Sequence, residues 1–252
     1  MSDAALFDYL LRLGDDRLVL GHRLSEWCGH GPILEEDIAL ANIALDFIGQ
    51  ANLLLGQAGM VEGKGRDADA LAFLRDAAEF RNVPLVEQPN GDYAATMVRS
   101  VLFDAYDYLV TRSLQGSSHP DLAGIAAKAH KEAVYHLRHS SEWLVRFGDG
   151  TEESHRRAQE ALDDLWRWTG GLFLTDDVDR ALQGQGVAPD LAALEPEWRR
   201  LVEEVIARAT LTLPPVQPIT SRGYRRGDHP EHLGHLLAEM QILPRTHPGA
   251  EW

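Results

Sequence analysis

The sequence contains a single cysteine, Cys28, among its 252 residues. An internal disulfide is therefore impossible, and nothing in the sequence requires an oxidising compartment. No stretch reaches the roughly 18 uninterrupted apolar residues of a membrane-spanning helix, and the amino end lacks the basic start and apolar run of a signal peptide. These absences predict a cytoplasmic protein without a membrane partner.

Basic residues are also scarce, since 24 Lys and Arg stand against 39 Asp and Glu and the formal net charge is −15. A surface this acidic repels phosphate backbones, which argues against nucleic acid as a partner. The sequence also lacks a G-x-S-x-G motif, a Walker loop and a Rossmann glycine run. Cys28 beside His30 is a lone thiol and gives little support for nucleophilic catalysis.

What the sequence does contain is apolar helical sequence, above all in residues 34–55, LEEDIALANIALDFIGQANLLL. Apolar residues occur there on nearly every side of a helix, which is typical of a buried helix. Asn42, Asp46 and Gln50 recur every four residues and form one polar row. Because buried polar groups cost about 1–3 kcal/mol each without hydrogen bonds, the row predicts polar partners on facing helices.

The rest of the chain predicts a helical bundle with peripheral helices, an all-α fold in one domain, 1–252. Periodicity, caps and breakers place further helices at 4–28, 67–80, 93–114, 122–147, 152–172, 196–211 and 229–243, with a short one after Thr175. Glycines predict a turn at 59–65. Prolines and Asn-Gly predict a structured loop at 83–92 and an irregular segment at 213–228. Four charged residues are expected on the solvent side of the first helix: Asp15, Asp16, Arg17 and Arg23.

Polar candidates for the bundle interior occur on three more helices. Glu26 follows His22 by one turn, although a surface pair is the simpler interpretation. The helix 93–114 carries two aspartates one turn apart, and the helix 122–147 carries a glutamate and a histidine one turn apart at the core edge. The predicted polar core therefore contains eight residues: Glu26, Asn42, Asp46, Gln50, Asp104, Asp107, Glu132 and His136.

A carboxylate-bridged di-iron bundle uses a Glu from each of two helices and Glu-x-x-His from each of two others. Here Gly49 and Tyr135 occupy the positions where the two histidines belong, three residues after Asp46 and Glu132. His136, at four residues after Glu132, is turned by roughly 100° from the usual position. We therefore predict no metal, cofactor or catalytic site in this chain and interpret the eight residues as a vestigial polar core.

Three other clusters admit a functional interpretation beside a structural one. Glu152 and His155 form a Glu-x-x-His, but in the first turn of a capped helix, where the macrodipole explains acidic residues. A second cluster could bind zinc or simply belong to an amphipathic helix: His229, His232 and His235, with Glu231 and Glu239. A basic loop could hold a phosphate or form a solvated or docking contact: Arg222, Arg225 and Arg226.

Several strings together resemble the C subunit of bacterial phenylacetyl-CoA epoxidases: RLGDDRLVLGHRLSEWCGHGP, DIALANIALDFIGQAN, LVEQPNGDYA, KEAVYHLRHS and EHLGHLLAEMQ. The resemblance covers nearly the whole chain. It implies a ferritin-like bundle that pairs with a catalytic A subunit holding the di-iron cofactor, together with a B subunit and a reductase. It also implies that the C subunit is the non-catalytic member of an oxygenase that epoxidises phenylacetyl-CoA with O2 and NADPH in aerobic phenylacetate breakdown.

Two alternatives remain open. One is a free-standing carboxylate-bridged di-iron oxygenase, and the other is an all-helical scaffold of another oxygenase or of a thioester-binding protein. In the favoured interpretation, the polar core keeps the bundle rigid for docking. Exposed apolar patches would mark the docking face, and the candidates for it include four tryptophans: Trp166, Trp168, Trp198 and Trp252.

Overall fold

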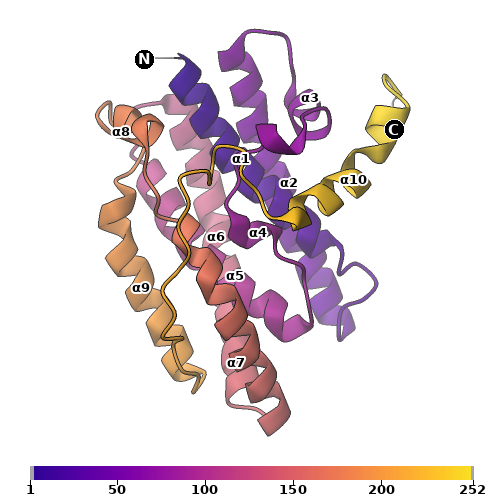
Figure 1. Ribbon diagram of the computed structural model, residues 1–252, viewed down its shortest axis with the longest axis vertical. Helices are drawn as coiled ribbons and strands as arrows, with labels where there is room; N and C mark the ends of the chain where they lie inside the picture. Colours follow the sequence, from indigo (N-terminus) through magenta and orange to yellow (C-terminus); the bar gives the residue numbers. More distant parts are fainter. Residues whose placement is uncertain (1–2, 251–252) are drawn as a thin grey trace. The chain divides into compact units, whose positions relative to one another are not determined.

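The computed structural model describes residues 3–250, and every regular element among these residues is helical (Figure 1). The all-α class predicted from the sequence is confirmed. The described chain divides into two compact units. Unit 1 contains the chain up to Pro89 and from Ser221 onward, and unit 2 is Asn90–Thr220. The sequence predicted a single ferritin-like domain. Because that depends on how the two units are placed relative to each other, it stays a prediction.

Unit 1 is built on two long helices that lie side by side, α1 (Asp3–Ser25) and α2 (Leu34–Glu62). Its shorter elements are α3 (Ala68–Phe73), η1 (Ala77–Glu79), α4 (Pro84–Glu87) and α10 (Glu231–Thr246). Although α10 comes from the far end of the chain, it packs against α1, α3, η1 and α4. The C-terminal segment is therefore part of the N-terminal unit.

Glycine allows α1 and α2 to approach closely. A Cβ atom added to Gly21 would lie 3.2 Å from the carbonyl oxygen of Ala44 and 2.9 Å from the side chain of Ile48. One added to Gly14 would lie 2.8 Å from the side chain of Leu55. Residues 9–21 of α1 are all buried. Helix α1 is therefore buried over more than three turns.

Helix α2 is buried on one side only, which corrects the prediction of a helix buried all round. Leu40, Phe47 and Leu54 are buried, whereas Leu45 is 65% exposed and Met60 is 67% exposed. Among the described residues, α2 alone has the length and hydropathy expected of a membrane-spanning helix. Within its most apolar stretch, 44% of the residues are buried in the protein, as expected of a helix with one buried side.

The connection after α2 differs from the sequence prediction in three places. The expected turn at 59–65 is wrong in part, because α2 continues to Glu62 and ends at Gly63, where φ is +69°. The expected helix 67–80 is two elements, α3 and η1, with Asp76 capping the second. The expected loop 83–92 contains α4, which begins at Pro84, a first-turn position that tolerates proline.

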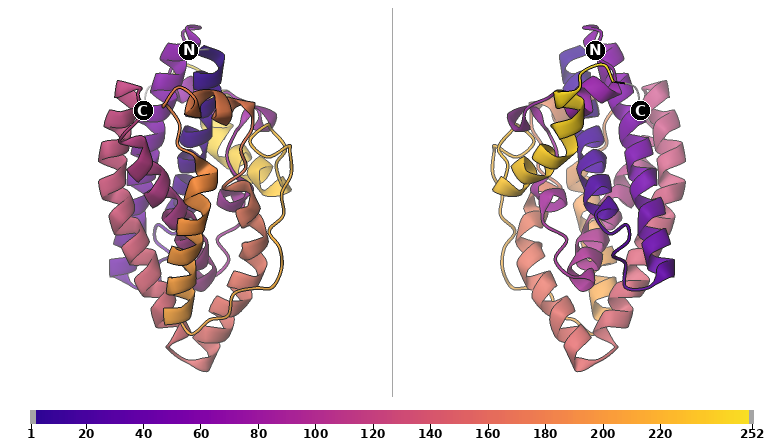
Figure 2. Two further views of the ribbon diagram at one scale, coloured as in Figure 1. Left: turned by 90° about the vertical axis from the view of Figure 1, so that its left-hand side faces the viewer. Right: turned by 90° about the vertical axis from the view of Figure 1, so that its right-hand side faces the viewer.

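Unit 2 is built on α5 (Tyr93–Leu114) and α6 (Pro120–Gly148), against which α7 (Glu152–Trp166) and α9 (Leu191–Arg208) both pack. Two short elements, η2 (Arg167–Gly171) and α8 (Asp177–Gln183), connect α7 to α9. Helices α6 and α7 meet at the turn seen at the lower end of both views in Figure 2. The predicted bounds of α5 are confirmed, and α6 is slightly longer than expected.

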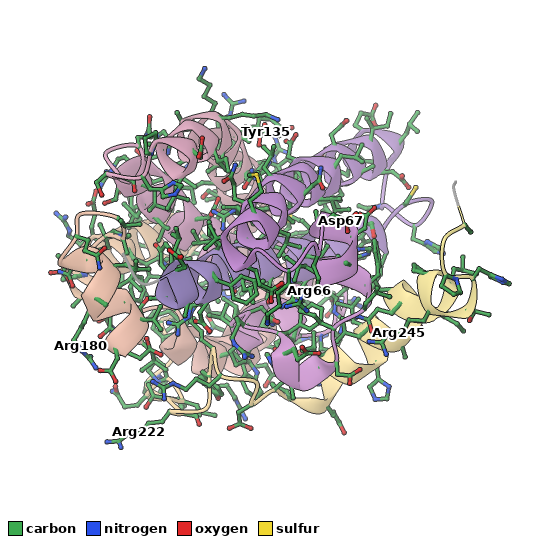
Figure 3. All side chains as sticks on the ribbon, turned by 90° about the horizontal axis from the view of Figure 1, so that it is seen from above. Arg66, Asp67, Tyr135, Arg180, Arg222 and Arg245 are labelled. Atoms are coloured by element: carbon green, nitrogen blue, oxygen red, sulfur yellow. The ribbon has the colours of Figure 1, made fainter. Side chains whose placement is uncertain are left out.

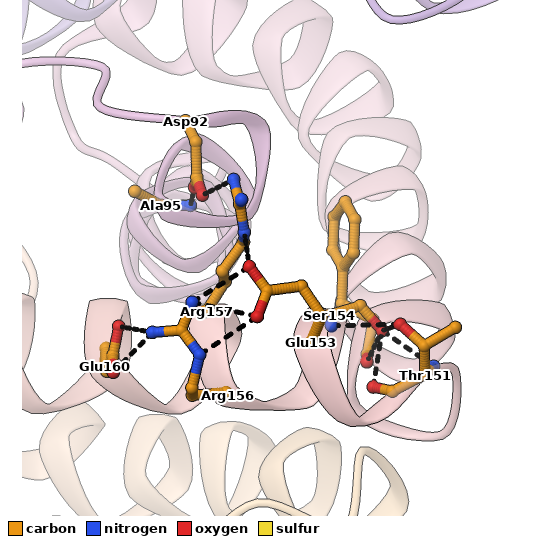
Figure 4. Close-up of polar contacts among 9 residues, drawn as sticks. Asp92, Ala95, Thr151, Glu153, Ser154, Arg156, Arg157 and Glu160 are labelled. Atoms are coloured by element: carbon orange, nitrogen blue, oxygen red, sulfur yellow. Dashed lines mark hydrogen bonds and ion pairs between the residues drawn. The ribbon is translucent and has the colours of Figure 1, made fainter.

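Short-range polar contacts fix the start of α7 (Figure 4). The Ser154 N–H donates to the Thr151 hydroxyl at 3.1 Å, and the Thr151 N–H donates to the Ser154 hydroxyl at 2.9 Å. Arg157 donates to Glu153 at 2.7 Å and to Asp92 at 3.3 Å. Since Asp92 is the N-cap of α5, these contacts join the beginnings of α5 and α7.

Helix α9 begins earlier than the sequence suggested. Its N-cap is Asp190, which accepts the N–H of Ala193 at 3.2 Å, and Pro196 lies inside the helix rather than at its start. An aspartate N-cap followed by apolar residues is sufficient to start a helix. The sequence instead suggested Pro196 as the first residue of this helix.

The tryptophans of unit 2 do not form an exposed patch. Trp198 donates its indole N–H to the carbonyl oxygen of Leu102 at 3.0 Å and stacks on Trp166, with ring centroids 5.8 Å apart. Because both rings are buried, the prediction that they mark a docking face is wrong. Trp168 is half-buried, and Trp252 lies outside the described residues.

Candidate functional site

A buried carboxyl group in unit 2 is the part of the predicted polar core that the structure assembles most clearly. Asp104 on α5 accepts the hydroxyl hydrogen of Ser140 on α6 at 2.7 Å. The carbonyl oxygen of His136 lies 3.0 Å from the same hydroxyl. All three residues are at most 3% exposed. Helices α5 and α6 therefore hold a carboxyl group and a hydroxyl together away from water, and His136, one turn before Ser140, is buried as well.

Burial raises the pKa of Asp104 from 3.8 to about 7. Desolvation of the carboxylate is the main cause, and the negative charge of Asp107 adds to it. His136, Ser140 and Arg99 favour the charged form but do not compensate for the burial. Asp104 therefore exchanges its proton near neutral pH, a property found both at functional sites and in structural polar clusters.

The residues flanking this cluster on α5 are also buried. Arg99 is 0% exposed and donates to the side-chain oxygen of Asn90 at 2.6 Å. Asp107 is 1% exposed, and its backbone carbonyl accepts the hydroxyl hydrogen of Thr111 at 2.6 Å. The predicted interior position of Asp107 is thus confirmed within unit 2.

Glu132 and Tyr135 on α6 lie toward solvent relative to His136. Glu132 is half-buried and lies 3.9 Å from the ammonium group of Lys128, which is exposed. Tyr135, labelled in Figure 3, is 40% exposed. The buried face of α6 consequently presents His136 and Ser140 rather than the glutamate and the residue three positions after it.

In unit 1, Gln50 is the predicted core residue with the clearest buried contact. Its side-chain oxygen accepts a hydrogen bond from the guanidinium of Arg17 at 2.8 Å, joining α2 to α1. Arg17 is itself buried and donates to the carbonyl oxygen of Leu13, so its predicted solvent position is wrong. Asp46, one turn before Gln50, is half-buried.

Two other predicted core residues of unit 1 lie at the surface. Asn42 is exposed, and its amide donates to the carbonyl oxygen of Ile38 at 2.9 Å. Glu26 is exposed and pairs with Arg23 at 2.9 Å. The expected interior position is wrong for both, because each finds a partner within one turn of its own sequence. The eight candidates fall four in each unit, so a core shared by the other six stays a prediction.

Sequence reasoning missed a buried ion pair in unit 1. Asp15 receives hydrogen bonds from Arg75 on both carboxylate oxygens and from the backbone N–H of Arg81 at 2.8 Å. Asp15 is 0% exposed and Arg75 is 2% exposed. The prediction that Asp15 faces solvent is wrong, because its partners come from a segment about 60 residues further along the chain.

Asp16 forms a second buried pair, with Arg225 at 3.1 Å, and accepts the backbone N–H of Val83 at 2.7 Å. Burial raises the pKa of Asp16, and the charge of Arg225 only partly opposes this. Asp16 is therefore not on the solvent side, contrary to the prediction. Arg23 is likewise buried and donates to the carbonyl oxygen of Glu87 at 2.8 Å.

A third pair joins Glu87 of α4 to His229, just before α10. The two ring nitrogens of His229 lie 2.5 Å from the Glu87 carboxylate and 3.0 Å from the Phe80 carbonyl oxygen. Because both neighbours are acceptors, the contact fits the doubly protonated imidazole. Burial lowers the pKa of His229, but the hydrogen bond and charge of Glu87 outweigh it and raise the pKa above 6.5. Burial also raises the pKa of Glu87, which accepts from Asn82 at 2.7 Å.

The three arginines of the basic loop, which form one cluster in the sequence, have different environments in the structure. Arg225 is 4% exposed and bound to Asp16, whereas Arg222 and Arg226 are exposed. Arg222 points outward in Figure 3. A shared phosphate site for all three arginines is therefore not formed, and Arg225 makes a buried contact within unit 1.

The histidine clusters are likewise structural. His229 precedes α10 and faces Glu87, while His235 is exposed on α10, so the zinc arrangement is not formed. In unit 2, Glu152 lies in the first turn of α7 and is exposed. A ring nitrogen of His155 lies 2.8 Å from the carbonyl oxygen of Gly148, at the end of α6.

The expectation that this chain holds no metal stays a prediction. Among residues 3–250, no three His, Cys, Asp or Glu side chains are grouped so that they could hold a metal ion. A di-iron bundle needs carboxylates and histidines that converge from four helices. Here Asp104 accepts a hydrogen bond from the Ser140 hydroxyl. Tyr135 occupies the position where a di-iron protein would have a histidine, and it is partly exposed.

Comparison with known proteins gives the family. The model of the family described as "Phenylacetic acid catabolic protein" matches residues 1–252. The chain belongs to this phenylacetic acid catabolic protein family. It is also 49% identical over 244 residues to the C subunit of the 1,2-phenylacetyl-CoA epoxidase of Escherichia coli (strain K12), covering 97% of this chain and 98% of that protein. The resemblance stated from the sequence strings is therefore confirmed.

Proposed function

We propose that this chain is the non-catalytic, structural C subunit of a multicomponent phenylacetyl-CoA 1,2-epoxidase, acting in the cytoplasm. It pairs with a di-iron catalytic A subunit in aerobic phenylacetate catabolism, and a B subunit and an NADPH-dependent reductase complete the system. The observation that carries the proposal is the near full-length similarity to the C subunit of such an epoxidase.

The geometry of the polar groups supports a structural role. Two of the buried carboxylates of unit 1, Asp15 and Asp16, are bound by arginines from other segments, and Asp104 of unit 2 is bound by a serine hydroxyl. Groups held in this way stabilise packing and specify one arrangement of helices. The vestigial polar core is part of the same proposal: it keeps the bundle in shape for docking.

Reconstitution of the epoxidase tests the proposal. The A subunit is assayed with phenylacetyl-CoA, O2, NADPH and the reductase, with and without this chain. We expect little product from either chain alone and product formation from the two together. Product formed by this chain and the reductase without the A subunit would overturn the proposal.

Two variants distinguish a structural role of Asp104 and His136 from a catalytic role. Asp104→Asn keeps an acceptor for Ser140, and His136→Gln keeps a polar group of similar reach, so both variants preserve the packing contact. We expect complexes containing either variant to retain most of the wild-type rate. A loss of about a hundredfold or more with intact complex formation would assign a catalytic role to these residues.

A further inference from the structure

One side of α2 carries an exposed apolar strip. We call it the α2 outer face, and it consists of Leu34, Ile38, Leu45, Leu53 and Met60 with Gly49 and Gly56. The first two apolar residues are 71% and 54% exposed, and Leu53 is 41% exposed. At 100° per residue all seven positions fall within about 100° of the helix circumference. The same arc also holds Glu35, Asn42 and Asn52, which are exposed, so this side of α2 is apolar except at these three positions.

The two glycines make the backbone of this face accessible. A Cβ atom added to Gly49 or Gly56 would have no atom within 4 Å. A glycine in a helix interior costs about 1 kcal/mol relative to alanine, so neither glycine is explained by packing within the chain. Small residues flanked by large apolar ones are what a second helix needs in order to pack closely.

The size of the face is that of an interaction surface. From Leu34 to Met60 it is about 39 Å long at 1.5 Å per residue, and a helix is about 10 Å wide. It therefore presents on the order of 400 Å², about half of what one partner contributes to a standard protein interface. Apolar patches of about this size on monomers are often functional.

Charge selects among the possible occupants. All charged residues of α2 are acidic: Glu35, Glu36, Asp37, Asp46 and Glu62. Helices that lie on membrane surfaces carry Lys and Arg on their polar face, so an anionic lipid surface does not suit α2. Parallel pairing with a second copy would bring the acidic starts of two α2 helices together, which is repulsive. A different chain with an apolar helix and basic residues near Glu35 fits best.

We propose that the α2 outer face is the surface through which this chain binds the catalytic A subunit, against an apolar helix of that subunit with basic residues near Glu35. This inference rests on the proposed function, because the similar protein carries the name of an epoxidase subunit. Burial of the face by the partner supplies the hydrophobic contacts that α2 lacks within its own chain.

Adding a side chain to the α2 outer face is the most direct test of binding through this face. Gly49→Leu adds a side chain where the isolated chain has open space, so helix content and thermal midpoint are expected to be kept or raised. The matched control is Gly234→Leu on α10, where an added Cβ also has no neighbour within 4 Å. We expect Gly49→Leu to weaken the Kd for the A subunit by about ten- to a hundredfold, and Gly234→Leu to leave it unchanged.

Adding a charge to the α2 outer face tests the same binding independently. Leu45→Glu places a carboxylate at the centre of the strip, and Leu243→Glu on α10 is the matched control, because this leucine is 54% exposed. We expect the first variant to remain folded and to lose copurification with the A subunit, while the second copurifies as the wild type does.

The outcomes distinguish this inference from the proposed function. If the wild-type chain binds the A subunit and both face variants bind it equally well, the face is wrong and the structural-subunit role stands. If the wild-type chain does not bind the A subunit at all, both proposals fail. A wild-type homodimer that becomes monomeric in Leu45→Glu would instead assign the face to a second copy, and face-dependent binding to phosphatidylglycerol vesicles would assign it to a membrane. Either result overturns the inference.

Discussion

In unit 1, three buried carboxylates are each bound by a cationic side chain from a distant part of the sequence, whereas in unit 2 Asp104 is bound by the hydroxyl of Ser140 on the adjacent helix. The unit 1 pairs are Asp15–Arg75, Asp16–Arg225 and Glu87–His229. Two of them hold the segment after Ser221 against the N-terminal helices. The comparison shows that buried charge in unit 1 joins segments, while in unit 2 a carboxyl with a pKa of about 7 remains between two helices.

The largest effect is expected when an ion pair of unit 1 is broken on one side. Arg75→Met leaves the Asp15 carboxylate buried without its cation, which costs about 3–5 kcal/mol in the free energy of unfolding. Urea denaturation followed by circular dichroism measures this loss. Adding Asp15→Asn should restore much of it, since asparagine still accepts the Arg81 N–H and carries no charge. A single-variant cost under about 1 kcal/mol would contradict the structural role of the pair.

The next effect concerns His229 and depends on pH. His229→Ala removes the contacts to Glu87 and Phe80 and is expected to cost about 2–3 kcal/mol below pH 6. Because the pKa of His229 is raised in the folded protein, its stabilisation is complete below its unfolded pKa of about 6.5. It is lost as the pH rises through the folded pKa. Denaturation at a series of pH values checks this, and a cost that grows with pH would reverse the assignment.

In unit 2, the burial of Asp104 determines whether this residue stabilises or destabilises the fold as the pH rises. Its raised pKa means that the folded protein holds the proton more tightly, so the group favours folding at low pH and disfavours it as the pH rises toward about 7. Asp104→Asn removes this dependence. We expect its stability relative to the wild type to increase by roughly 1–2 kcal/mol between pH 5.5 and pH 7. Asp164→Asn, at an exposed aspartate of α7, is the control that should show no such trend.

The smallest effect is expected at a surface pair of unit 2. Arg112 donates to Glu197 at 3.0 and 2.6 Å, but the two side chains are 40% and 34% exposed. Glu197→Gln is therefore expected to cost no more than about 1 kcal/mol, and less at high salt. Thermal unfolding at low and high salt measures it. A cost equal to that of Arg75→Met would remove the contrast between buried and exposed pairs.

Much of the helical framework could be predicted from the sequence. The bounds of α5 follow from Asp92 as a cap and from a long apolar pattern, both of which are local signals. The all-α class and the irregular segment before α10 follow from the same kind of signal. The early start of α9 shows the limit, because Pro196 can be accommodated inside a helix that begins at Leu191.

The buried charges could not be predicted because their partners are remote in the sequence. Asp15 and Asp16 look like solvent residues until Arg75 and Arg225 are brought to them by the fold. Asn42 shows the opposite error, since a polar residue in an apolar helix suggested burial but lies on the exposed side. Composition alone cannot distinguish a helix buried in its own chain from one with an open apolar side.

The candidate site was predicted in part. The sequence placed Asp104, Asp107 and His136 in the interior, and the structure buries all three. It could not show that the hydroxyl of Ser140 would bind Asp104, because serine has no spacing signal comparable to Glu-x-x-His.

Iron content tests the central claim most directly. The chain is purified alone and in complex with the A subunit, and iron is measured per chain by plasma mass spectrometry. We predict far less than one iron in the isolated chain and about two per A subunit in the complex. The complex should keep this content when this chain carries Asp104→Asn. About two irons in the isolated wild-type chain would contradict the account and assign a metal centre to this subunit.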